Sequence, residues 1–337
     1  MPEPPVPDER VKLRALLFDA DGGDRRIEED AIDLSTLGER QLLWIDLQDN
    51  EDGEAAPVLE RLLGRLELEG ARQAIAGLGG KPRLRNYGDW FLVEVAAVEC
   101  GKHLAFNARG MALLCGRNFV LSLHRGPLEI LDELYERERG ETRIGVLHAE
   151  SFTASLLDWQ VDSYLNAVSE LEEAVDKLEV RILGRKRYPE CLPELARMRR
   201  GASRLRRMLA PHRHVFGALA RPDFRPDEDD DAAERRFEAL ELRFERAMDA
   251  VEMGRELVVG SFELYTSRSA QRTNDTMRVL TFVTVLLGTL AVVAGVLGMN
   301  FKAPLFDSGA NGFWISLAAM GTFAIVSLVI ARLMKWM

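Results

Sequence analysis

Cysteine and histidine are scarce in this chain of 337 residues, which contains only three and five of them. The spacing of Cys100, Cys115 and Cys191 matches no Cys-x-x-Cys zinc or redox motif, and their odd number suggests buried free thiols in a cytoplasmic domain. His212 and His214 lie two residues apart, which places them on different faces of a helix. They are therefore poor joint ligands for zinc, and a solvated or core histidine is the simpler interpretation.

Excess positive charge is also absent, because 54 acidic residues outnumber 44 basic ones and leave a formal net charge of −10. This balance argues against nucleic-acid binding and favours a cationic partner. The first residues, MPEPPVPDER, lack the basic segment and apolar run of a secretory signal peptide. We therefore expect no signal peptide.

Recognisable catalytic motifs are missing as well. The segment LLFDADGGD (16–24) places Asp-x-Asp after an apolar strand, but it lacks the Thr or Val that the phosphatase motif has next. The segment GLGGKP (77–82) lacks the spacing of a phosphate-binding loop. We interpret the first segment as a strand-end turn, and we expect neither enzymatic activity nor a cofactor.

Long apolar runs are absent from most of the chain, whose mean hydropathy is −0.11 and whose charged residues amount to 29%. They are concentrated at the C-terminal end, where Val279 to Phe301 and Ser308 to Ala331 contain no charged residue. Each run exceeds the roughly 20 residues that cross a bilayer. The sequence therefore predicts two transmembrane helices.

Lysine and arginine flank these two runs asymmetrically. Close to the two runs, the basic residues that precede the first run or follow the second are Arg268, Arg272, Arg278, Arg332 and Lys335. Only Lys302 lies between the runs. By the positive-inside rule, both termini are predicted to be cytoplasmic, and the short connection faces the outside of the inner (plasma) membrane.

Residues 1–146 are predicted to form a cytoplasmic α/β domain. Strand-like runs are LRALLF (13–18), LLWIDL (42–47), WFLVEVAAVE (90–99), MALLC (111–115) and FVLSLH (119–124). Between them, 57–68 and 127–139 have the apolar spacing of helices.

Residues 147–278 are predicted to form a cytoplasmic funnel and stalk of long helices. Apolar residues recur at spacings of 3 and 4 from Leu157 to Ile182, from Leu195 to Leu219 and from Phe237 to Val258. No proline occurs from Ala232 until Pro304, so the third helix and the first span, which opens the transmembrane hairpin at 279–337, are predicted to be one helix of about 100 Å. Such a helix cannot be the core of a compact monomer, and we expect self-association.

The first span ends in Gly-Met-Asn, within the segment QRTNDTMRVLTFVTVLLGTLAVVAGVLGMNF (271–301). This segment resembles the pore of the CorA-type divalent-cation transporters, a superfamily that includes the ZntB-like zinc transporters. The similarity extends to the long helix at 156–179 and to Lys335-Trp336 near the C-terminus. Three residues alone are weak evidence, but their place before a C-terminal hairpin makes the resemblance specific.

The resemblance implies a funnel-shaped homopentamer in the lipid bilayer, with an α+β cytoplasmic domain, a helical coiled-coil stalk and two C-terminal transmembrane helices. Five first spans would surround a pore. Carried over by position, the pore lining comprises Asn274, Met277, Leu280, Thr284, Gly288, Ala291 and Gly295. The selectivity filter would comprise Gly298, Met299 and Asn300, with the metal held by Gly298 and Asn300. The spacings of 3 and 4 between the pore-lining positions independently place them on one helical face. Close helix packing is the alternative explanation for the small residues among them.

Neutral oxygens at such a filter suit Mg²⁺, which gives up its water reluctantly. Carbonyl and amide oxygens can hold the hydrated ion through its water, and a ring without carboxylates lets the ion leave. Met277 and Leu280 would close the pore by excluding water. A simple helix cap formed by Gly298 and Asn300 is the alternative explanation of the motif.

Two features depart from the family pattern. The outer loop continues as KAPLF, with Lys302 where a cation approaches and Asp307 as its only acidic residue. The segment RRFEALELRFERAMD (235–249) also gives no clear match to the regulatory acidic residue that relatives carry on the stalk.

The sequence thus favours passive transport of a divalent cation, Mg²⁺ first, with Co²⁺ and Ni²⁺ as secondary ions. Zinc transport, with or without proton coupling, is the second interpretation. The spans contain no carboxylate or histidine for a proton relay, which argues against coupling. A non-transporting, membrane-tethered scaffold is the third interpretation, although it leaves Gly-Met-Asn without a role.

Overall fold

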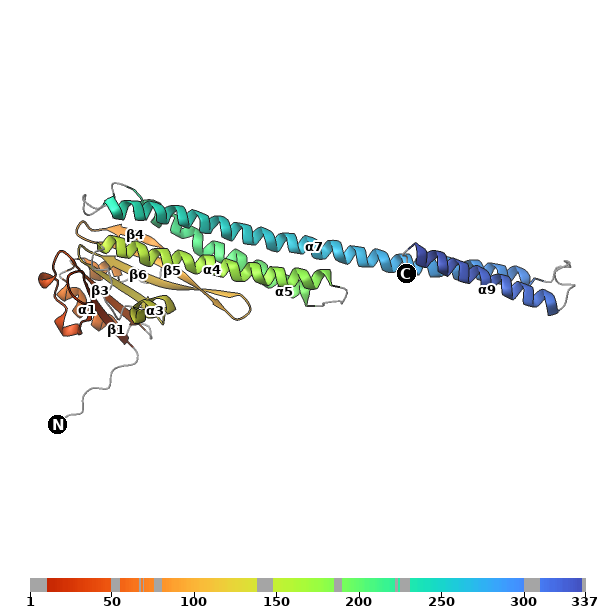
Figure 1. Cartoon of the computed structure of the whole chain (residues 1–337), viewed down its shortest axis with the longest axis horizontal. Helices are drawn as coiled ribbons and strands as arrows, with labels where there is room; N and C mark the ends of the chain where they lie inside the picture. The colour runs from red at the N-terminus through yellow and green to blue at the C-terminus, as the bar shows by residue number, and fades with distance from the viewer. Residues whose placement is uncertain are drawn as a thin grey trace, which may run out of the picture. The chain divides into compact units, whose positions relative to one another are not determined.

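The computed structural model describes residues 11–49, 55–66, 68, 70–75, 81–137, 148–184, 190–221, 224, 231–299 and 310–334. The chain forms two compact units, of which the first comprises 1–181 and 187–261 and the second comprises 182–186 and 262–337. Figure 1 shows the elements of each unit along the chain.

The first unit contains a seven-stranded sheet in the order β2-β1-β3-β7-β6-β5-β4. Its strands are β1 (Val11–Asp19), β2 (Arg25–Arg26), β3 (Gln41–Asp49), β4 (Arg83–Asn86), β5 (Phe91–Gly101), β6 (Ala105–Cys115) and β7 (Phe119–Arg125). Neighbouring strands are antiparallel except β3 and β7, which run parallel. The five strands predicted from the sequence are confirmed, whereas β2 and β4 were not predicted because they are short and rich in arginine.

The two faces of the sheet are covered by different helices. Helices α1 (Ala56–Arg65) and α2 (Ala71–Ile75) pack on one face and share its apolar core with Ala15 and Leu17 of β1. The opposite face carries Arg14, Phe18 and Trp44. Phe152 of α4 (Ala149–Leu183) packs against the rings of Phe18 and Trp44, with ring centroids 5.7 and 5.8 Å apart.

A buried charged cluster lies on this second face. Asp46 accepts hydrogen bonds from Nη2 of Arg14 at 2.5 Å and from Oγ of Ser122 at 2.5 Å, and Nε2 of His124 lies 3.2 Å from Oδ1 of Asp46. Burial raises the pKa of Asp46, but the bonds from His124, Arg14 and Ser122 outweigh it and lower that pKa below its usual value. Arg14 also donates to Asp132 of α3 (Glu129–Arg137) at 2.5 Å, so the cluster fastens α3 to the sheet.

Long helices complete the first unit, as the heptad spacing predicts. Helix α5 (Cys191–Leu209) follows α4, and α7 (Asp231–Leu297) is one uninterrupted helix of 67 residues that contributes to both units (Figure 1). The three predicted apolar stripes are buried, from Leu157 to Ile182, from Leu195 to Leu219 and from Phe237 to Val258.

The second predicted stripe does not lie on one continuous helix. A 3-10 turn at Ala210–His212 separates α5 from α6 (Arg213–Leu219). Pro211 has no N–H group for the helical hydrogen-bond ladder, so the helix tightens there while its apolar side stays buried.

His212 is a core residue that covers a free edge of the sheet. Strand β4 pairs with β5 only from Phe91 to Glu94, and among the described residues no strand pairs with this edge of β5 beyond that point. Nε2 of His212 accepts a hydrogen bond from the Ala96 N–H at 2.9 Å, and the amide of Gln160 donates to the Ala96 carbonyl at 2.6 Å. Side chains thus replace the missing strand.

The pKa of His212 makes this arrangement sensitive to acid. Burial lowers it to about 4, compared with 6.5 for a free histidine. As the pH falls from 6.5 to about 4, the unfolded chain binds a proton here and the folded chain does not. The free energy of unfolding should therefore decrease by on the order of 3 kcal/mol over this range and be independent of His212 above it.

We expect His212→Gln to remove this component of the pH dependence, because its amide oxygen can accept from the Ala96 N–H without titrating. The measurement is the thermal unfolding midpoint of the full chain in detergent between pH 4 and 7.5. His214→Gln is the matched control, since His214 is exposed. An unchanged pH profile in His212→Gln would contradict the assignment.

Candidate ion pathway

The last part of α7 is built for an apolar environment. From Val279 to Leu297 it contains no charged side chain, and helical hydrogen bonds satisfy its backbone, as a bilayer requires. Two of its hydroxyl groups are satisfied within the helix, because Thr284 donates to the Leu280 carbonyl at 2.9 Å and Thr289 donates to that of Val285 at 2.8 Å. Helix α9 (Ala310–Leu333) is equally apolar, and both helices are long enough to cross a membrane.

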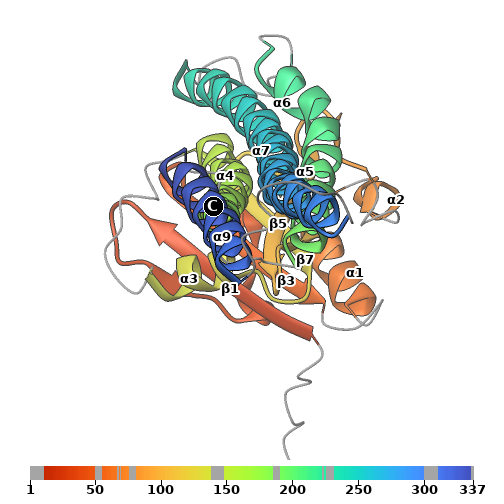
Figure 2. The ribbon, with the colours of Figure 1, turned by 90° about the vertical axis from the view of Figure 1, so that its right-hand side faces the viewer.

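One side of this segment packs within the second unit. Helix α9 lies alongside it in both views (Figures 1 and 2). The half-buried residues at spacings of 3 and 4 are Val279, Phe282, Leu286 and Leu290. These larger apolar residues form the packing side of α7 towards α9, a side that was not predicted from the sequence.

The residues predicted to line a pore lie on the other side of α7. All of Asn274, Met277, Leu280, Thr284, Gly288, Ala291, Gly295 and Gly298 are exposed. At 3.6 residues per turn, this side is centred roughly 160° from the side that packs towards α9. A Cβ atom added at Gly288 or Gly295 would meet no atom within 4 Å. The structure therefore brings these residues together on one face that a single chain leaves uncovered.

Helix α7 ends beside the Gly-Met-Asn motif, and of its described residues neither Gly298 nor Met299 has a left-handed backbone. The Gly298 N–H donates to the Ala294 carbonyl at 3.0 Å, and the Met299 N–H donates to that of Val296 at 3.2 Å. Gly298 has no positive φ, and a Cβ there would lie 3.3 Å from the Ala294 oxygen. A left-handed cap, the usual reason for glycine at a helix end, does not explain Gly298.

Three predicted site residues cannot be placed. Asn300, Lys302 and Asp307 lie outside the residues that the structure describes, as do Lys335 and Trp336. Met299, the last described residue of this segment, is 50% exposed. Within the described part of the chain, no group of three His, Cys, Asp or Glu residues could hold a metal ion.

The exposed face continues towards the N-terminal side of Met277 as a shallow, uncharged hollow. Its lining residues are Tyr265, Thr266, Ser269, Ala270, Thr273, Asn274 and Met277. Next to it, Nη2 of Arg272 donates to the carbonyl of Gly184 at 2.7 Å, which ties the end of α4 to α7. Arg272 precedes Val279 by about 10 Å along the helix. Neither feature was predicted from the sequence, although hydroxyl-bearing residues recur there at spacings of 3 and 4.

Comparison with known proteins identifies relatives along nearly the whole chain. The family described as CorA-like Mg²⁺ transporter protein matches residues 39–332. The cobalt/magnesium transport protein CorA of Thermotoga maritima is 26% identical over 76% of this chain and 73% of its own length. The divalent cation transporter CmaX of Pseudomonas aeruginosa is 26% identical over 98% of both chains.

A zinc transporter is also similar to the chain. The zinc transport protein ZntB of Pectobacterium carotovorum is 22% identical over 96% of this chain and 93% of its own length. Among solved structures, the CorA magnesium transporter of Methanocaldococcus jannaschii has a TM-score of 0.69 at 21% identity, covering 96% of this chain and 98% of that one. This likeness confirms the predicted fold, a soluble α/β domain followed by a long helix and two apolar C-terminal helices.

The two sides of α7 should differ in their access to water. We expect Thr284→Cys, on the uncovered face, to react with a charged, water-soluble thiol reagent at least tenfold faster than Leu286→Cys, which faces α9. The reaction rate is measured on purified protein in liposomes, against the parent chain with its own three cysteines. Equal rates, or faster reaction of Leu286→Cys, would contradict the geometry.

Proposed function

The chain belongs to the CorA-like Mg²⁺ transporter family, and we propose that Mg²⁺ is the main ion that it carries, with Co²⁺ and Ni²⁺ as secondary ions. Membership makes it a divalent-cation transporter of the inner membrane, with two spans and a cytoplasmic N-terminal domain. It also rules out the interpretation as a non-transporting scaffold. The proposal rests on one observation above all, the uncharged and uncovered face of α7 that ends at Gly-Met-Asn.

Several copies are needed to turn this face into a route for ions. In one chain the face is open on all sides, so it encloses no water. Earlier in α7, Met253 and Val259 are 61% and 42% exposed, which leaves apolar surface for a second copy to cover. The resemblance to the CorA-type transporters supplies the number five. In the proposed homopentamer, five α7 helices surround the pore.

The filter chemistry follows from the absence of carboxylates on this face. Five Asn300 side chains and five Gly298 carbonyls would present neutral oxygens to a hydrated ion. Mg²⁺ keeps its water more firmly than most divalent ions, so recognition through the water shell suits it. Below the filter, Met277 and Leu280 are 55% and 58% exposed in the single chain and would form apolar rings that close by excluding water.

Zinc is the second candidate ion, because the chain is also similar to a zinc transport protein. The spans offer no Asp, Glu or His for a proton relay, and the sequence retains Gly-Met-Asn followed by Phe301. Both features favour passive magnesium transport. Uptake of Mg²⁺, Co²⁺, Ni²⁺ and Zn²⁺ into liposomes, with and without a pH gradient, decides between the two ions.

The filter assignment predicts a strong effect of Asn300→Ala. The arriving hydrated ion loses hydrogen bonds that are worth about 1.5–3 kcal/mol each when a charged group takes part. A loss of about 1.4 kcal/mol lowers a rate tenfold, so Mg²⁺ uptake into liposomes should fall at least tenfold.

The matched control is Asn311→Ala, an exposed asparagine at the start of α9 whose loss should leave uptake near wild type. Native mass spectrometry of both variants should show intact pentamers. Near-normal uptake by pentameric Asn300→Ala would refute the filter assignment, and a stable dimer in mild detergent would refute the proposed assembly.

A further inference from the structure

Helix α5 carries a row of arginines on the side that faces away from the core of the first unit. Arg197, Arg200, Arg204 and Arg207 recur at spacings of 3 and 4, which places them on one side of the helix. All four are exposed, and the buried residues of α5 lie on the other side. These four residues, the arginine row, concentrate positive charge in a chain whose net charge is −10.

Two other arginines of this segment, on the side towards α7, are paired within the chain. Nε of Arg206 lies 3.2 Å from Oε2 of Glu252, and Nη2 of Arg213 lies 2.6 Å from Oε2 of Glu245. Both glutamates belong to α7. These two arginines therefore have carboxylates of their own chain as partners, and they are not part of the row.

The arginine row has no carboxylate partner among the residues that the structure describes. Arg204 donates to the neutral side-chain oxygen of Asn107 at 3.3 Å, which leaves its charge in place. Over the same described residues, Arg197, Arg200 and Arg207 form neither a hydrogen bond nor an ion pair. Four positive charges within about 15 Å along one helix repel one another unless an anionic partner covers them. The row is therefore suited to an anionic partner outside the chain.

Helix α4 carries acidic residues on its own free side. Glu170, Glu173 and Asp176 recur at a spacing of 3 and are exposed, and we call them the acidic row. Asp176 has no partner within the described part of the chain. Glu173 pairs with Lys177 at 2.6 Å, but both side chains are exposed, and such surface pairs contribute little. Three carboxylates outnumber one ammonium group, so this side of α4 stays negative.

The partner of Glu170 does not neutralise it. Its carboxylate lies beside the thiol of Cys100, and burial together with Glu170 raises the pKa of Cys100 to about 12. The thiol is therefore uncharged at neutral pH, and Glu170 keeps its negative charge.

The two rows lie at the same level along the antiparallel helices α4 and α5. Nη2 of Arg181 in α4 lies 3.3 Å from Oε1 of Glu194 in α5, which aligns the two helices. From this ion pair, Glu173 lies about 12 Å along α4 and Arg200 about 9 Å along α5, in the same direction. All of these residues belong to the first unit.

The rows are on opposite flanks of one copy. In the view along the helices, α4 and α5 lie on either side of α7 (Figure 2). Each row is on the side of its helix away from the buried residues, so the two rows face away from each other. A single chain therefore cannot bring them together.

We propose that the arginine row of one copy docks against the acidic row of the next copy. The inference rests on the proposed homopentamer. Rotation about an axis parallel to α7 keeps each residue at its level, so the two rows of neighbouring copies meet. Contacts between two different surfaces of identical chains generate rings when the rotation closes. The docking would join neighbouring cytoplasmic units through helices that take no part in the candidate pore.

A second copy fits these observations better than another anionic partner does. An anionic lipid or polymer would account for the arginine row alone. A second copy accounts for both rows, for their common level and for their positions on opposite flanks. Opposite charges on facing surfaces also fix which parts of two copies meet, because a shifted arrangement would bring like charges together.

Chemical cross-linking of the full chain in detergent tests the docking. Glu173→Cys combined with Arg200→Cys should be joined between copies by a short bismaleimide, and denaturing gels should show covalent multimers. Glu173→Cys combined with Arg199→Cys is the matched control, because Arg199 is also exposed but is turned about 100° around α5. We expect the control to react at least tenfold more slowly. Equal rates in the two variants would overturn the proposal.

Reversal of one charge on each row tests the attraction itself. Arg197 and Asp176 lie at similar distances from the ion pair that aligns the helices, about 5 and 8 Å. In the cross-linkable variant, Arg197→Glu should slow the cross-linking at least fivefold, and Asp176→Arg added to it should restore the rate. No slowing by Arg197→Glu, or no recovery with Asp176→Arg, would contradict the pairing of the rows.

Native mass spectrometry and Mg²⁺ uptake of the same variants separate this inference from the proposed function. If cross-linking fails while the pentamer and its uptake persist, only the docking of the two rows is wrong. If the native spectrum of the parent chain shows no pentamer, the proposed assembly is wrong as well.

Discussion

A doubly charged ion cannot enter hydrocarbon without compensation, and the structure of the second unit depends on this constraint. Transfer of even one isolated charge into a medium of low dielectric constant costs tens of kcal/mol. The spans of this chain contain no charged residue that could offset that cost. Water and neutral oxygens must supply the compensation, so one face of a membrane helix has to border water. The uncovered side of α7 is that face in our account.

The two sides of α7 differ in the size of their side chains. Large apolar residues such as Phe282 and Leu286 lie towards α9, whereas Gly288, Ala291 and Gly295 lie on the opposite side and leave space next to the helix. The same helix continues into the cytoplasmic unit, where its buried stripe packs with α4 and α5. One uninterrupted helix therefore belongs both to the candidate pore and to the cytoplasmic domain.

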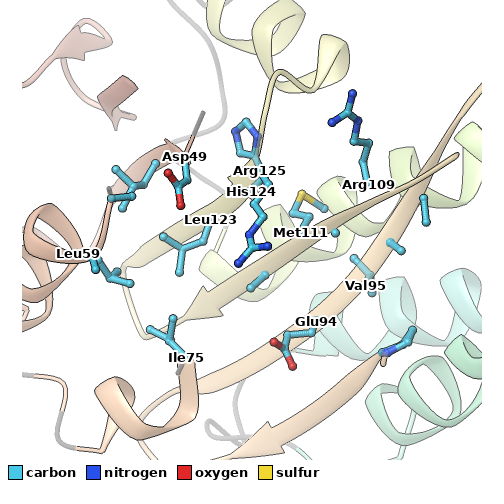
Figure 3. Close-up of a pocket in the computed structure, with 18 of the residues that line it drawn as sticks. Asp49, Leu59, Ile75, Glu94, Val95, Arg109, Met111, Leu123, His124 and Arg125 are labelled. Carbon is cyan, nitrogen blue, oxygen red and sulfur yellow. The ribbon is translucent and has the colours of Figure 1, made fainter. Parts of the chain in front are cut away.

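Features that repeat one spacing over many residues could be predicted from the sequence. Short strands, and features formed by residues that are far apart in the sequence, could not. The heptad stripes and the two spans repeat one spacing over many residues, so single exceptions do not hide them. Strand β4 has only four residues, two of them arginines, and its role appears only where side chains such as His212 cover the remaining edge of β5. A cavity over the sheet beside α1 is lined in part by Ala96 of β5 and Gly110 of β6, small residues of separate strands that meet only in the sheet (Figure 3). The candidate pore face could be predicted from residues spaced 3 and 4 apart in the sequence. Only the structure shows that this face lies on the opposite side of α7 from α9.

The central claim is that the small-residue face of α7 borders the ion route. Mg²⁺ uptake into liposomes tests it most directly when a tryptophan is placed on either side of the helix. Our account predicts that Ala291→Trp abolishes uptake while the assembly stays intact. Val296→Trp, at a residue that is 58% exposed on another side of α7, should retain most of the uptake. Normal uptake by Ala291→Trp, or loss of uptake only in Val296→Trp, would contradict the account.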